Sequence, residues 1–216
     1  SLIPESTTGT RAKIKTPFQA VGARGVNSLA SKLLFALLPP STAFFKLSID
    51  SLELLKQGQE GLETEIDKGL RTIETALMNE IEVSNDRVAM FEALKHLIVG
   101  GNVLLYLTDD GLKVYPLSKF VCKRDAVGNV LEIITQESIH PNALPSEFLE
   151  QIKKKDNYDE KAMDSDLDIY TYITRVDDDF IWYQECKGEK IPGTDGRSKV
   201  DVSPWITLRF VRIDGE

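Results

Sequence analysis

Small and apolar residues recur every three or four positions between residues 16 and 38, which predicts an amphipathic helix. We expect it to open at Thr16-Pro17, because Thr can cap a helix and Pro is tolerated in the first turn. Pro39-Pro40 should end it. Its last turns are apolar on every side, so we expect deep burial there, with Leu29 and Leu33 in the core. The predicted buried stripe is Phe18, Val21, Gly22, Gly25, Leu29, Leu33 and Ala36, and the opposite face carries Arg24, Asn27 and Ser31.

Two more helices and a short strand are predicted before residue 101. Residues 43–49 (AFFKLSI) have the composition of a strand. Residues 61–83 place apolar side chains on one face and acidic ones on the other, which indicates a long amphipathic helix. Ser84 is suited to cap a third helix over residues 85–99. Gly100-Gly101 should end that helix, because Gly adopts the left-handed conformation without steric cost.

The rest of the chain is rich in predicted strands. Residues 102–107 and 112–117 can pair across a turn, and residues 120–136 form a hairpin around Gly128-Asn129. A short helix is predicted at 145–155, followed by an acidic, weakly ordered stretch over 156–168. Further strands are expected at 168–176, 180–188 and 205–213. Asp177-Asp178-Asp179, between the first two of these, has the pattern of a solvated turn.

Helices followed by a mainly antiparallel sheet predict an α+β fold. We divide the chain into an extended arm (1–15), a helical part (16–101) and a β-rich part (102–216). No internal repeat is visible. A chain of 216 residues can bury a core without disulfides or structural metals.

Charge is distributed unevenly along the chain. Residues 1–50 carry a net charge of +4 and residues 51–216 a net charge of −12, which together give −8. Proteins that hold DNA tightly neutralise phosphates with Lys and Arg, so a mostly acidic chain is a poor candidate for wrapping DNA. It remains compatible with letting DNA pass through. No apolar run reaches the ~20 residues of a membrane-spanning helix, and no signal peptide is visible.

Motifs that mark common active sites are missing from the sequence. We find no Walker loop, GxGxxG, HExxH or GxSxG pattern. The two histidines, His96 and His140, have no Ser or Cys partner that we can nominate. Cys122 and Cys186 are far apart and are interpreted as reduced thiols, although a disulfide between them stays open. We therefore assign no catalytic, cofactor-binding or metal-binding residue, and no cofactor.

Two short patterns imitate ligand sites. Gly22-Ala23-Arg24-Gly25 matches the GxxG loop of an RNA-binding module, but it lies inside a predicted helix. There, two glycines would let another backbone approach closely or permit a bend. Asp164, Asp166 and Asp168 imitate the start of a calcium loop, but that loop needs Gly and Glu at the positions of Ile169 and Arg175.

Basic residues near the start of the chain are the remaining candidates for binding. They could contact phosphates or an acidic neighbouring protein, or they could form an ordinary solvated face. These residues are Arg11, Lys13, Lys15, Arg24 and Lys32.

Five segments, taken in order along the chain, carry a resemblance to a known family. They are TPFQAVGARGVNSLASKLLFALLPP (16–40), RVAMFEALKHLIVGGNVLLYL (87–107), YPLSKFVCKRDAVGNVLEIITQESI (115–139), DIYTYI (168–173) and VRIDGE (211–216). The blocks QAVGARG, with Gln19, Gly22 and Gly25, and FEALKHLIVGGNVLLYL are long enough to be specific. Together these segments resemble the head-to-tail connector (portal) proteins of short-tailed podoviruses.

The resemblance implies a structural role in the virion. Such proteins form a ring, commonly of twelve subunits, at one capsid vertex, and double-stranded DNA enters and leaves through its central hole. The implied partners are the major capsid and scaffolding proteins, the terminase large subunit that hydrolyses ATP, and tail adaptor proteins. The segment resembles the wing of the subunit, and the family's stem, clip and crown are not in this chain. The implied subunit is not an enzyme, needs no membrane, and is assembled in the host cytoplasm.

A ring uses heterologous contacts, in which one face of a subunit meets a different face of the next. The acidic body and the basic first fifty residues offer complementary surfaces for such contacts. We therefore expect Arg24, Asn27, Ser31 and Lys32 to face a neighbouring subunit or the capsid. The alternative is an acidic, non-enzymatic interaction module that docks another protein and never forms a ring. A small hydrolase that uses buried carboxylates is a third class.

Overall fold

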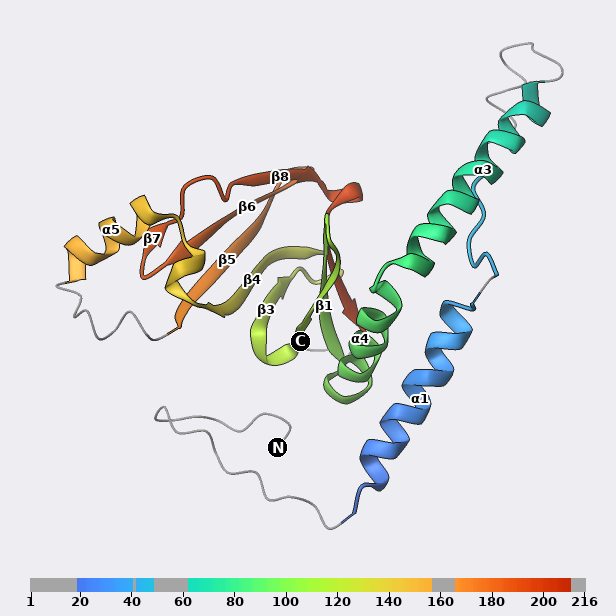
Figure 1. Ribbon diagram of the computed structural model, residues 1–216, viewed down its shortest axis with the longest axis horizontal. Coiled ribbons are helices and arrows are strands. Elements are labelled where there is room, and N and C mark those ends of the chain that lie inside the picture. The colour runs from blue at the N-terminus through green and yellow to red at the C-terminus, as the bar shows by residue number, and fades with distance from the viewer. Residues whose placement is uncertain (1–18, 41, 49–61, 157–165, 211–216) are drawn as a thin grey trace. The chain divides into compact units, whose positions relative to one another are not determined.

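The computed structural model of the protein describes residues 19–40, 42–48, 62–156 and 166–210 (Figure 1). The chain divides into two units, residues 1–99 with 108–114, and residues 100–107 with 115–216, which we treat separately. Predictions for the arm over 1–15, the Thr16-Pro17 opening and the order of 157–165 fall outside the described residues. The last strand, predicted over 205–213, ends earlier, at Arg209, because Phe210 is a bend.

The first unit is built from helices α1 (Val21–Leu37), α3 (Leu62–Val83) and α4 (Asp86–Gly100). Helix α1 begins later than predicted, since Gln19 and Ala20 are not helical. Ala20 precedes it and provides no side-chain cap. Two glycines, which favour a helix least among residues other than proline, occupy its first turns.

Residues 42–48 form no strand, so the prediction for 43–49 is wrong. A strand requires a neighbouring strand to take its backbone hydrogen bonds, and here one of those bonds goes to a helix side chain instead. The Leu47 N–H donates to Glu74 Oε1 on α3 at 2.5 Å.

The start of α4 and its end follow the prediction closely. Ser84 Oγ accepts a hydrogen bond from the Asp86 N–H at 3.4 Å, although Asn85 is the residue directly before the helix. The Asp86 carboxylate also accepts the N–H of Leu112 at 2.8 Å, which ties the helix start to residues 108–114 of the same unit. Gly101 follows the helix with φ +72, the left-handed conformation expected of a glycine stop.

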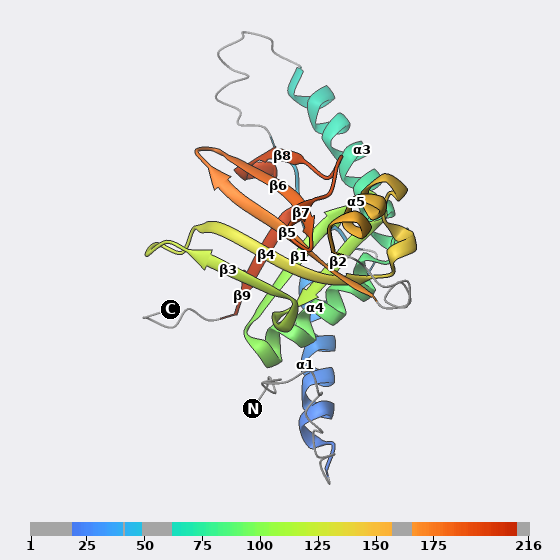
Figure 2. The same cartoon turned by 90° about the vertical axis from the view of Figure 1, so that its left-hand side faces the viewer.

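The strands form two antiparallel sheets (Figure 2), and residues 111–114 of the smaller one belong to the first unit. In the smaller sheet, β1 (Asn102–Thr108) lies between β2 (Gly111–Pro116) and β9 (Trp205–Arg209). The larger sheet has the order β3-β4-β5-β6-β7, and β8 also pairs with β6. Its strands are β3 (Phe120–Arg124), β4 (Val130–Ile139), β5 (Leu167–Val176), β6 (Asp179–Cys186), β7 (Glu189–Lys190) and β8 (Gly196–Lys199).

Short helices complete this unit. They are α5 (Ser146–Asp156) and the 3-10 turns Leu117–Lys119, Pro141–Ala143 and Val200–Val202. The α+β prediction is confirmed, as are helix α5 and the hairpin between β3 and β4, where Gly128 has φ +105. Strands β7 and β8 were not predicted. Both are short and polar, so neither shows the alternation that reveals a strand.

A hydrophobic core lies between the two sheets. Leu104 and Trp205 of the small sheet pack with residues of the larger one. The members are Leu104, Tyr115, Phe120, Ile133, Ile173, Phe180 and Trp205. A second cluster lies under α5 and consists of Leu144, Phe148, Ile152, Leu167, Ile169, Cys186 and Ile191.

One row of the large sheet shows how closely this core is packed. Ile133 pairs with Ile173, which pairs with Trp182, which pairs with Gly196 on β8. A Cβ at Gly196 would lie 2.0 Å from the Trp182 indole, a distance that real Cβ atoms do not show. Only glycine leaves room for the indole at this point of the strand.

Candidate functional site

The polar face of α1 is where the sequence predicted a contact surface. Arg24 and Asn27 are exposed, as is Lys32 one turn further on. Ser31 is half-buried, and its hydroxyl donates to the Asn27 backbone carbonyl at 2.9 Å, so this side chain is engaged with its own helix. Arg11, Lys13 and Lys15 lie outside the described residues. The structure therefore leaves Arg24, Asn27 and Lys32 available for a partner.

The apolar side of α1 differs from the prediction. Leu29, predicted to be core, is 44% exposed, Leu33 is only half-buried, and Phe35 near the end of the helix is 62% exposed. Ala30 is the one buried residue of this helix. The spacing correctly identified an amphipathic helix, but periodicity cannot say whether the surface that covers an apolar stripe belongs to the same chain.

The glycines of the QAVGARG block lie on this exposed helix. A Cβ at Gly22 or at Gly25 would have no atom within 4 Å beyond its own helix neighbours. The close backbone approach that the sequence suggested is therefore not made by any described part of this chain. Gln19 is exposed just before the helix.

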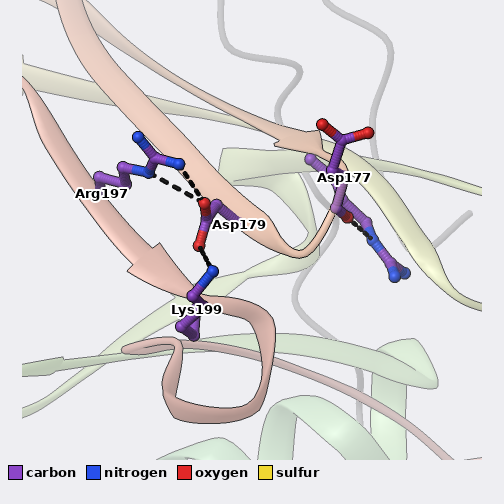
Figure 3. Close-up of polar contacts among 5 residues, drawn as sticks. Asp177, Asp179, Arg197 and Lys199 are labelled. Carbon is purple, nitrogen blue, oxygen red and sulfur yellow. Dashed lines mark hydrogen bonds and ion pairs between the residues drawn. The ribbon is translucent and has the colours of Figure 1, made fainter.

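A buried carboxylate that the sequence did not reveal lies at the start of β6 (Figure 3). Asp179 is only 6% exposed, so its prediction as part of a solvated turn is wrong. Lys199 Nζ lies 3.0 Å from its Oδ1, and Arg197 Nε donates to its Oδ2 at 3.0 Å, with a second contact from the same guanidinium. Asp177, two residues earlier, points away from this cluster (Figure 3).

The strand register explains this arrangement. Asp179 pairs with Lys199, and Arg197 lies two residues before Lys199 on the same face of β8. The Arg197 hydrogen bond, followed by that of Lys199, holds the pKa of Asp179 below its usual value. The cluster joins β8 to β6 and gives each carboxylate oxygen a cationic partner within the chain. The sequence feature that could have revealed the cluster is the spacing of Arg197 and Lys199, two cations two residues apart, on a strand that pairs with the one carrying Asp179.

Other titratable groups of the described residues include His96, His140, Cys122, Cys186 and Tyr115. His96 lies 3.6 Å from Glu92 on its own helix, and His140 Nδ1 accepts the Asn142 N–H at 3.3 Å. Cys122 and Cys186 are free thiols, and burial raises the pKa of each, which disfavours the reactive thiolate. Burial, together with Glu137, likewise raises the pKa of Tyr115, whose hydroxyl donates to Glu137 Oε2 at 2.9 Å.

An open hollow of about 350 Å³ lies in the first unit. It is lined by Ala43, Glu74, Thr75, Met78, Asn79 and Glu82. Glu74 already accepts the Leu47 N–H. Across residues 19–40, 42–48, 62–156 and 166–210, no group of three His, Cys, Asp or Glu side chains is placed to hold a metal ion. Within those same residues, no helix is long and apolar enough to span a membrane.

Comparison with known proteins points to one family over almost the whole sequence. Residues 3–216 match the model of the family described as bacteriophage head to tail connecting protein. The chain is 40% identical over 226 residues to the portal protein of Escherichia phage T7 and 42% identical over 225 residues to that of Enterobacteria phage T3. It is 29% identical over 210 residues to the portal protein of Enterobacteria phage SP6, with 92% of the chain covered.

The first two alignments include all of the chain but only 41% of each relative, and the third includes 39% of its relative. The chain therefore spans about two-fifths of the length of the curated relatives that it matches.

Proposed function

Because the chain belongs to the bacteriophage head to tail connecting protein family, we propose that it is part of a portal subunit. The observation that carries this proposal is the match to the family model over residues 3–216, with identities of 40% and 42% to two portal proteins. In this role the subunits form a closed ring, commonly of twelve copies, at one vertex of the capsid. Viral DNA passes through the ring during packaging and ejection.

Within the subunit, we assign the chain to the wing. Helix α1, with its exposed apolar and cationic side chains, would provide the contact to a neighbouring subunit or to the capsid. The partners of the whole ring would be the major capsid and scaffolding proteins, the terminase large subunit, tail adaptor proteins and the DNA in the channel. The ring would be a component of the virion, assembled in the host cytoplasm.

The subunit would act through its geometry and would catalyse no reaction of its own. ATP hydrolysis would belong to the terminase, and the ring would guide the DNA. An overall acidic chain is consistent with a surface that lets DNA slide, because it does not neutralise phosphates over an extended area.

Electron microscopy of the complete gene product that contains this sequence tests the proposal. We expect closed rings with a central hole, and a mass in solution that corresponds to about twelve subunits. The same preparation should not hydrolyse ATP unless the terminase is added. Monomers at all protein and salt concentrations would contradict the proposal and favour the acidic interaction module.

A further inference from the structure

Two arginines of the second unit converge on the loop between β3 and β4. Arg124, at the end of β3, donates from Nη1 to the Gly128 carbonyl at 3.1 Å. Arg209, at the end of β9, places Nη2 3.7 Å from the position that a Cβ would take on the same glycine. Both side chains are half-buried. Strands far apart in the sequence therefore bring two guanidinium groups to one residue.

The carboxylates of this hairpin are engaged elsewhere. Asp125 Oδ1 accepts the N–H groups of Val127, Gly128 and Asn129 at 2.7–2.9 Å, and its Oδ2 accepts the Asn129 side-chain amide at 2.8 Å. Glu132 lies 3.4 Å from Lys123 across the two strands. In the part of the chain that the structure describes, neither Arg124 nor Arg209 has an ion pair with a carboxylate.

The pKa of the Cys122 thiol is affected by both arginines. Burial raises the pKa of its thiol, and the positive charges of Arg124 and Arg209 oppose that rise. Like charges brought together at half-buried positions repel each other, and this repulsion is relieved when an anion binds between them. A guanidinium also presents paired N–H donors that match a carboxylate.

We propose that Arg124 and Arg209 form a receptor for a carboxylate side chain of a neighbouring copy of this chain. This inference rests on the proposed ring, in which each subunit meets the next through two different faces. Charge complementarity identifies the occupant, since residues 51–216 carry a net charge of −12 and any neighbouring copy presents many carboxylates. Two arginines on a surface of that net charge are too few to hold a DNA backbone.

The first test removes both cations from the complete gene product. Arg124→Gln/Arg209→Gln should lower the apparent association constant of ring assembly at least about tenfold, because each lost contact is a charge-assisted hydrogen bond. The measurement is the fraction of rings against subunit concentration, by analytical ultracentrifugation. Its matched control is Lys123→Gln/Lys190→Gln, which removes the same charge from cations that already have partners in their own chain, Glu132 and Asp195.

The control double variant should assemble like the wild type. Equal assembly of all three proteins, or an equal loss in both variants, would overturn the inference while leaving the proposed ring intact. Normal rings that have lost only their affinity for duplex DNA would also overturn it and would assign the arginines to nucleic acid. Absence of rings in the wild type itself would mean that the proposed function fails, and the inference with it.

The second test identifies the occupant directly. Arg209→Lys keeps the charge and supplies an amine that a carbodiimide couples to an adjacent carboxylate. We expect a cross-link between residue 209 and an Asp or Glu of another copy, seen as a covalent dimer and mapped by mass spectrometry. Lys123 provides an internal reference, because it should couple to Glu132 of its own chain. Rings in which Lys123 couples but residue 209 does not, or couples only within its own chain, would contradict the proposal.

Discussion

The sheet-rich unit and the helical unit differ in how many of their apolar side chains are buried. Nearly all fully buried hydrophobic residues belong to the second unit, where two clusters lie between the sheets and under α5. In the first unit only Ala30, Ala93 and Leu94 are buried hydrophobic residues, among those that the structure describes. Its exposed large apolar side chains include Val21, Leu29, Phe35, Leu37, Ile73, Leu77, Val83 and Val88. One unit has a core of its own, whereas the helices of the other leave large apolar side chains exposed.

Truncating one apolar side chain in each unit should give the largest difference between the two units in the free energy of unfolding. Phe148 is 1% exposed in the cluster under α5, so Phe148→Ala should lower the free energy of unfolding by about 3–5 kcal/mol. Leu29 is already largely in water, so Leu29→Ala should cost less than about 1 kcal/mol in the 216-residue chain. Urea unfolding followed by circular dichroism measures both. A cost for Leu29→Ala comparable to that for Phe148→Ala would show that α1 is buried in solution.

Replacing one glycine by alanine in each unit should give the second difference in stability. At Gly196 a Cβ would collide with the Trp182 indole, so Gly196→Ala should destabilise the chain by about 1–3 kcal/mol. At Gly22 the space is empty, and Gly22→Ala should stabilise α1 by about 0.5–1 kcal/mol through helix propensity alone. The thermal midpoints should therefore move in opposite directions. If Gly196→Ala left the midpoint unchanged, the packing of β8 against Trp182 would be incorrect.

The same contrast explains how far the sequence could predict the fold. Helices α3, α4 and α5 and the hairpin at Gly128 followed from periodicity and turn chemistry, which depend on nearby residues. The predictions that Leu29 is buried and that Asp179 is exposed to solvent were both wrong. Burial at each position depends on residues that are distant in the sequence. Leu29 is left 44% exposed by the described residues, and Asp179 is paired with the cations of a polar strand eighteen residues away.

For the candidate site, the sequence predicted the exposed cations of α1 but not the arginine pair. Arg124 and Arg209 come together only through the pairing of β3 with β4 and the position of β9. No spacing in the sequence encodes that convergence, whereas the use of the Asp125 carboxylate by its own loop is the ordinary behaviour of an Asp before a turn.

The buried carboxylate predicts a pH dependence confined to the sheet-rich unit. The pKa of Asp179 is lowered in the folded state, so the stabilisation is complete above its unfolded value near ~3.9 and is lost as pH falls through the folded pKa. Asp179→Asn should lower stability at pH 7. The difference in stability between this variant and the wild type should become smaller as the pH falls below about 4. Urea midpoints between pH 7 and pH 3 measure this gap.

Asp177→Asn makes the same chemical change two residues away, where the side chain points away from Arg197 and Lys199 (Figure 3). Asn also tolerates the φ of +54 at this position. This control should match the wild type across the pH range. A gap for Asp179→Asn that persists unchanged to pH 3 would mean that its ion pairs contribute nothing and that the loss has another origin.

The smallest effect on the chain itself is expected on the exposed polar face of α1, and there it separates stability from assembly. Arg24 is exposed, so Arg24→Glu should change the free energy of unfolding by no more than about 0.5 kcal/mol. In the complete gene product the same reversal should impair ring formation, because it places an acid where an acidic neighbour or capsid surface is expected to bind. Arg71→Glu, at an exposed position on α3, is the charge-matched control. Normal rings from Arg24→Glu would remove this face of α1 from the subunit contact, whereas impaired rings with unaltered unfolding would show that its side chains serve assembly and not the fold.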